Sequence, residues 1–113
     1  KETKIEELIS IEDFMKIKLK VGKVISAERI KNSKKLIKLI VDIGNEIQIV
    51  AGIGEQYSPE ELIGKSIVVL SNLKPTKLMG VESQGMLLAA TGSNGTISIL
   101  TIDRDVNPGA GIK

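Results

Sequence analysis

An alternating pattern in the middle of the chain is the feature that most restricts the fold. Every second residue over 37–43 is a large aliphatic, and two of the three positions between them are the charged residues Lys38 and Asp42. Gly44-Asn45 then interrupts the pattern, which resumes over 47–49. A period of two with one apolar face predicts half-buried strands, and a glycine-led turn between them predicts a β-hairpin.

Two short helices are predicted by capping patterns. Ser10, followed by Asp13 three residues later, predicts one or two helical turns over 11–16. Ser58-Pro59-Glu60-Glu61 combines a cap, a proline suited to the first helical position and a capping-box glutamate, so a second helix should end at Gly64.

The other predicted elements are strands. Alternation begins again at Ile17 and changes phase at Gly22, where a β-bulge is expected. Apolar runs predict strands over 65–71 and 85–91, and a last strand or hairpin near 96–102.

Three strands, a short helix and two more strands form the order expected of an all-β, five-stranded OB-fold barrel. The alternative is a small SH3-like barrel, which the helix after the third strand disfavours. A length of 113 residues fits a single domain over 1–113, with the barrel over about 11–90 and a C-terminal extension over 91–113.

Composition narrows the possible functions. The chain has no cysteine and no histidine, which removes disulfides, thiol chemistry and the commonest general base and metal ligand. We therefore expect no cofactor and no metal. No apolar run is long enough to span a membrane, and Lys1-Glu2-Thr3-Lys4 does not open a secretory signal, so a cytoplasmic protein is expected.

Charge is distributed unevenly along the chain. Residues 16–38 contain nine lysines and arginines and one acid, whereas 39–63 contain five acids and no lysine or arginine. A concentrated basic block suits phosphate binding, although a solvated lysine-rich strand face would look the same. Lys18, Lys20, Lys23, Arg29 and Lys38 would point outward from the first two strands of an OB barrel, near the face where such folds bind oligonucleotides.

Aromatic residues are scarce, which bears on the kind of nucleic acid. Phe14 and Tyr57 are the only two. Proteins that bind single strands stack bases on aromatic side chains. A basic face without such a platform fits folded RNA better than an unstructured strand.

The segment from 71 to 90 is the most unusual. It contains Lys74 and Lys77 beside Pro75, then a polar turn between Gly80 and Gly85. The lysines can reach phosphates, and the segment also offers hydrogen-bonding side chains and an exposed methionine. A long connector that only closes the barrel is the alternative.

Asn72-Leu73-Lys74-Pro75, followed by the run from Lys77 to Ala89 (Lys-Leu-Met-Gly-Val-Glu-Ser-Gln-Gly-Met-Leu-Leu-Ala), resembles the signature of the tRNA-binding domain family. Val21-Gly22-Lys23-Val24, 49–53 and 57–65 are similar to the family as well. The family includes the C-terminal domain or beta subunit of methionyl-tRNA synthetase and stand-alone structure-specific tRNA-binding proteins.

The resemblance implies an OB fold, homodimerisation through the C-terminal extension, and shape-directed binding to the outer corner of tRNA without catalysis. A partnership with a methionyl-tRNA synthetase catalytic chain is also implied. Carried onto matching positions, the implied RNA-binding residues are Lys23, Arg29, Lys35, Asn72, Lys74, Lys77, Ser83 and Met86. In the first loop only Lys35-Leu36 matches the His-Pro-Asp-Ala-Asp-Lys-Leu found in many members.

Two other functions are alternatives to RNA binding. The apolar C-terminal half could dock a synthetase, making the chain an assembly domain. An enzyme would have to use carboxylates and lysines alone, and neither Gly52-Ile53-Gly54 nor Ser83-Gln84-Gly85 matches a phosphate-binding or nucleophile motif. Asp103 and Asp105 are expected to be surface charges.

Overall fold

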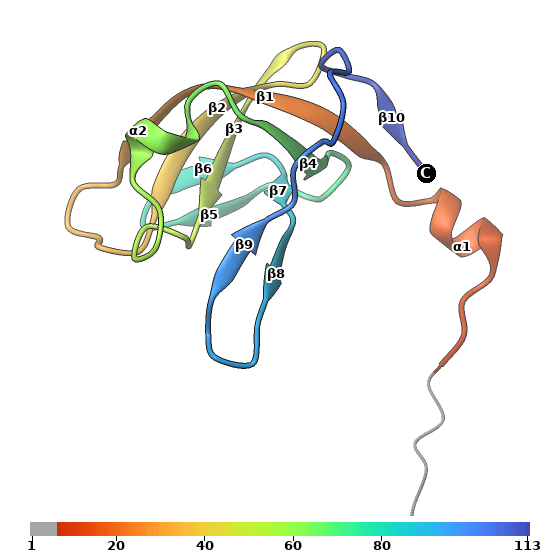
Figure 1. Ribbon diagram of the computed structural model, residues 1–113, viewed down its shortest axis with the longest axis horizontal. Coiled ribbons are helices and arrows are strands. Elements are labelled where there is room, and N and C mark those ends of the chain that lie inside the picture. The colour runs from red at the N-terminus through yellow and green to blue at the C-terminus, as the bar shows by residue number, and fades with distance from the viewer. Residues whose placement is uncertain (1–6) are drawn as a thin grey trace, which may run out of the picture.

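The computed structural model describes residues 7–113 and is dominated by short strands (Figure 1). Lys1-Glu2-Thr3-Lys4, where no secretory signal was predicted, lies outside these residues. The elements are α1 (Ile11–Met15), β1 (Leu19–Arg29), β2 (Ile37–Asp42), β3 (Glu46–Ala51), α2 (Pro59–Leu62), β4 (Ser66–Leu70), β5 (Thr76–Leu78), β6 (Val81–Ser83), β7 (Met86–Leu87), β8 (Ala89–Thr91), β9 (Ile97–Ile99) and β10 (Gly111–Ile112).

One antiparallel sheet forms the barrel, with the strand order β3-β2-β1-β4-β7. The first half of β1 pairs with β4 on one side and with β10 on the other, whereas its second half pairs with β2. A long central strand that pairs with β2 along one half and with β4 along the other is typical of an OB-like barrel, so the predicted fold class is confirmed.

The apolar side chains that alternate along β2 and β3 point into the barrel and form its core, as predicted. Ile37, Leu39, Val41 and Ile49 have no exposed surface, and Leu62 of α2 is 1% exposed beneath them. Both predicted caps are present, since the Ser10 hydroxyl accepts the Asp13 amide hydrogen bond and the Glu61 carboxylate accepts that of Ser58.

The bulge predicted at Gly22 is wrong. The β1–β4 pairing runs regularly across this residue, and the register with β2 shifts between Val24 and Ser26 instead. Gly22 faces the interior, where a Cβ atom would lie 2.6 Å from Val41 Cγ1 and 2.9 Å from Val69 Cγ2. Glycine is therefore needed at this position for close packing inside the barrel.

The predicted strand over 85–91 divides into β7 and β8, which is a second correction. β7 pairs with β4, whereas β8 pairs with β9 in a hairpin that leaves the barrel (Figure 1). Leu88 lies at the change of partner, because its amide donates to Val68 O and its carbonyl accepts from Leu100 N. No helix among residues 7–113 has the length and apolarity needed to cross a membrane.

Candidate nucleic-acid interface

An exposed hairpin, β5–β6, emerges from the 71–90 segment. Thr76, Lys77 and Leu78 pair with Ser83, Glu82 and Val81. Residues 72–80 are exposed throughout, so Lys74 and Lys77 are both open to solvent. Within residues 7–113 neither lysine takes part in a salt bridge, which leaves their charges available to an anionic ligand.

Ser83 anchors the base of this hairpin. Its side chain is buried (3% exposed), and its hydroxyl accepts a hydrogen bond from Val50 N at 2.9 Å and donates one to Gly85 O at 3.0 Å. Both hydrogen-bonding functions of the hydroxyl are therefore used inside the protein. Ser83 was expected to contact RNA, and in this structure its hydroxyl is buried and holds the base of the hairpin.

Two glutamines also attach the base of the hairpin to β3. Gln48 N donates to Gln84 Oε1 and Gln84 N donates to Gln48 O, at 2.8 and 2.7 Å. The Gln48 side chain also donates to Glu82 O at 2.8 Å. These bonds hold β6 beside β3 and attach the hairpin to the barrel.

Asn72 joins the start of the exposed segment to the first strand. Its Oδ1 accepts from Lys18 N at 3.0 Å, and its Nδ2 donates to Lys16 O at 2.7 Å. The amide expected to contact sugar or base edges is thus engaged with backbone. Asn72 fixes where the segment carrying Lys74 begins.

Arg29 and Lys35 lie at the loop between β1 and β2. Arg29 Nη1 donates to Gly54 O at 2.7 Å and to Lys34 O at 3.2 Å, so this cation ties two loops together. The aliphatic part of Lys35 covers Gly52, because a Cβ atom at Gly52 would lie 3.2 Å from Lys35 Cε. The ammonium of Lys35 is left at the edge of this loop.

Met86 lines an open groove of about 460 Å³ between the end of β3 and the β7–β8 segment. Gly52, whose Cα is covered by the aliphatic part of Lys35, lines the same groove. Met86 is 43% exposed and offers the groove an apolar, polarisable surface.

The remaining basic residues are distributed along β1 and β2. Lys23 is exposed opposite Asp42, and Lys38 forms a 2.9 Å salt bridge with Glu28. Lys18 and Lys20 line a different groove, beside the chain's C-terminus. The basic block is therefore only partly free to neutralise phosphate.

The aromatic residues do not form a stacking platform. Tyr57 packs against the core, and its hydroxyl accepts a hydrogen bond from Ile99 N at 3.1 Å. Phe14 lies in α1 at the groove beside the C-terminus. Among residues 7–113 no group of three or more acids is arranged to hold a metal ion.

Local sequence patterns did not reveal the hairpin attachment. Gln48 and Gln84 are far apart in the sequence, and no local pattern indicates that they pair. The β5–β6 turn could have been predicted from the dipeptide Met79-Gly80, which separates two short runs of alternating polar and apolar residues.

Comparison with known proteins identifies relatives of the whole fold. Residues 19–111 match the family model described as "Putative tRNA binding domain". The chain is 58% identical over 106 residues to a methionine–tRNA ligase of Thermotoga maritima, covering 93% of the chain and 17% of the ligase. The chain spans about a sixth of the length of the curated relatives it matches.

Solved structures show the same fold. A MetRS-related protein from Pyrococcus horikoshii has a TM-score of 0.91 at 48% identity, covering 96% of this chain and all of that one. The protein described as chaperone CsaA from Bacillus anthracis has a TM-score of 0.85 at 29% identity, covering 95% of this chain and all of that one.

Proposed function

Because the chain belongs to the tRNA-binding domain family, we propose that it binds folded tRNA through the β5–β6 hairpin and the neighbouring Met86 groove. The domain is a non-catalytic binding module. The observation that carries this placement is the exposed pair Lys74 and Lys77 on a hairpin fixed to the barrel by Ser83 and the two glutamines.

The predicted site residues divide into two groups. Lys74, Lys77, Lys35 and Met86 supply the contacts to RNA, and Lys23 adds charge from β1. Asn72, Ser83 and Arg29 hold these residues in place through internal hydrogen bonds. The scarcity of aromatic side chains favours an RNA whose own fold presents the phosphates.

The salt dependence of tRNA binding tests this placement. Lys74→Ala combined with Lys77→Ala removes two phosphate contacts, so the slope of log K against log salt should flatten by about 1.5. The matched control is Lys16→Ala with Arg104→Ala, whose side chains are 79% and 92% exposed on other elements. Because both belong to the elements proposed below to form a dimer, the variants are compared under conditions in which all of them sediment alike. If both double variants flatten the salt slope equally, the hairpin is not the binding site.

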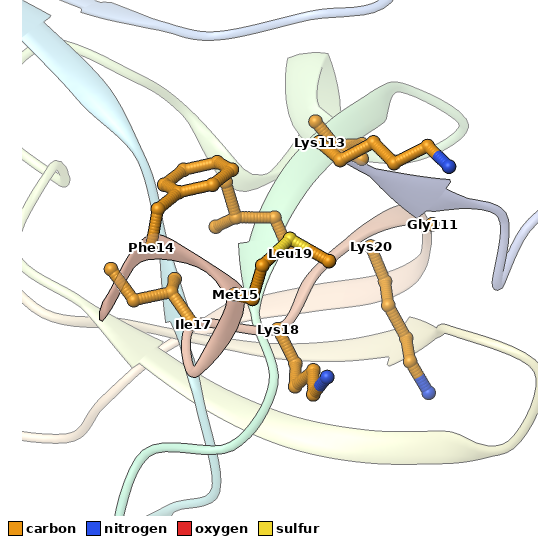
Figure 2. A pocket seen from close by; sticks show the side chains of 9 residues that line it. Phe14, Met15, Ile17, Lys18, Leu19, Lys20, Gly111 and Lys113 are labelled. Atoms are coloured by element: carbon orange, nitrogen blue, oxygen red, sulfur yellow. The ribbon is translucent and has the colours of Figure 1, made fainter. Parts of the chain in front are cut away.

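A homodimer is proposed at the other end of the barrel. Figure 2 shows Phe14, Met15, Ile17 and Leu19 gathered at a groove of about 390 Å³ between α1 and β10, with Lys18 and Lys20 extending away. Ile11, Met15 and Ile17 are 66%, 49% and 41% exposed, and a cluster of exposed large aliphatic side chains is typical of an interface.

We propose that a second copy covers this groove, using the extension over 91–113 together with α1. Dimerisation would raise avidity if one tRNA contacts both barrels. Met15→Glu with Ile17→Lys should convert a dimer to a monomer in analytical ultracentrifugation, whereas Ile63→Lys, at a 51% exposed position outside both α1 and 91–113, should not. A parent chain that sediments as a monomer at tens of micromolar contradicts the proposal.

Similarity to methionine–tRNA ligases supports a role as a tRNA-binding accessory of such an enzyme in the cytoplasm, as a C-terminal domain, a separate subunit or a stand-alone homologue. Adding the chain to a ligase catalytic fragment should raise kcat/KM for tRNA without changing amino-acid activation. An assembly domain without RNA affinity would instead retain the ligase but no tRNA at low salt.

A further inference from the structure

The turn of the β5–β6 hairpin holds a residue in an unfavourable backbone conformation. Leu78 pairs with Val81, so Met79 and Gly80 form a two-residue loop. Their φ angles are +51° and +79°, as in a type I′ turn. Glycine adopts such angles freely, and asparagine is the usual residue at the first position, whereas methionine is disfavoured there.

The Met79 side chain does not compensate for this conformation inside the protein. It is 58% exposed at the tip of the hairpin, so it adds little packing. An outlying backbone angle that brings no internal contact is typical of a binding site, where the side chain is held ready for a ligand. Ser83 and Gln84 attach the base of the hairpin to β3 in the closed form.

The neighbours of Met79 indicate the chemistry of that ligand. Leu78 immediately precedes Met79 and is 37% exposed, and Lys77 lies one residue earlier on the exposed strand β5. An apolar tip beside a cation is complementary to a ligand that offers both an uncovered aromatic face and negative charge. Nucleobases in a folded RNA meet both requirements, since phosphates flank any base whose face is left unstacked.

We propose that Met79 packs against the exposed face of a nucleobase, or of a terminal base pair, in the tRNA that the lysines hold. A thioether is polarisable and makes favourable contacts with aromatic rings, and apolar side chains including methionine act as wedges against base steps elsewhere. The inference rests on the proposed tRNA binding and adds a contact that does not depend on charge.

Met79→Asn separates the proposed contact from a structural role. Asparagine suits the type I′ position, so the variant should unfold at the same or a higher urea concentration than the parent. Its affinity for tRNA should nevertheless fall about fivefold, with the salt slope unchanged, because an apolar contact releases no counterions. Met79→Leu keeps an apolar side chain and should bind within about twofold of the parent.

The same variants are measured on a long double-stranded RNA, whose bases are covered by their neighbours except at the ends. The parent and Met79→Asn should bind this duplex equally. An unchanged tRNA affinity in Met79→Asn, an equal loss on the duplex, a flatter salt slope or a lower urea midpoint would each overturn the inference. A parent that fails to bind tRNA would overturn the proposed function as well, so the two failures are distinguishable.

Discussion

Replacing Ser83 by alanine tests whether this residue stabilises the hairpin or contacts RNA. The substitution leaves Val50 N–H without its 2.9 Å acceptor and Gly85 C=O without its 3.0 Å donor, in a region where Ser83 is 3% and Val50 7% exposed. Orphaning a buried polar group costs about 1–3 kcal/mol. The carbonyl keeps a second lone pair and contributes less, so we expect a total loss of about 2–3 kcal/mol in the free energy of unfolding.

Urea and thermal unfolding measure this loss. For a domain of this size each kcal/mol lowers Tm by about 4 °C, so Ser83→Ala should unfold about 8–12 °C below the parent. Ser98→Ala, at an exposed position of β9, is the matched control and should stay within about 0.5 kcal/mol. The salt slope of tRNA binding, measured well below the lower Tm, should be unchanged.

One result would refute the reasoning. If Ser83→Ala keeps the parent's stability and yet loses most of its tRNA affinity, the hydroxyl contacts RNA directly. The hairpin would then have to rearrange when RNA binds, since the hydroxyl is enclosed in the free protein.

Two further predictions concern close packing and the basic loop. Gly22→Ala places a methyl group 2.6 Å from Val41 Cγ1 and should cost about 1–3 kcal/mol in urea unfolding, whereas Gly111→Ala, with no atom within 4 Å, should cost far less; equal costs would contradict the interior role of Gly22. Arg29→Lys keeps the charge but cannot reproduce the two bonds to Gly54 O and Lys34 O, so hydrogen exchange over 52–57 should accelerate while the salt slope for tRNA stays the same. Unchanged exchange there would remove Arg29 from its anchoring role.

Local patterns predicted the elements whose cause is local. The alternation along β2 and the capping box before α2 each act within a few residues, and both are confirmed. The bulge was misplaced because the requirement for Gly22 comes from Val41 and Val69 on other strands. The phase change seen in the sequence reflects burial on both faces of β1, because Val21 and Val24 lie on opposite faces of the strand and are 3% and 2% exposed.

In the candidate site, too, the features with a local cause were predicted and those that depend on distant residues were not. Exposed lysines of the 71–90 segment were identifiable because charge and proline mark a surface segment. The burial of Ser83 was not, since its partner Val50 is 33 residues away in the chain and only the folded barrel brings them together. Asn72 was likewise expected to face the ligand, but its partners are backbone groups more than 50 residues away.

The glutamine pair at the edge of β3 has a consequence for the dynamics of the barrel. Gln48 and Gln84 exchange one backbone and one side-chain hydrogen bond at the point where the barrel closes. A closure of few bonds should open at lower free energy than the continuous β1–β2 ladder, giving the hairpin its own opening equilibrium. A ligand that binds only the closed form must slow this opening by mass action. Slower amide exchange at Gln48 and Val50 would then indicate that a ligand is bound at the hairpin, although neither residue belongs to it.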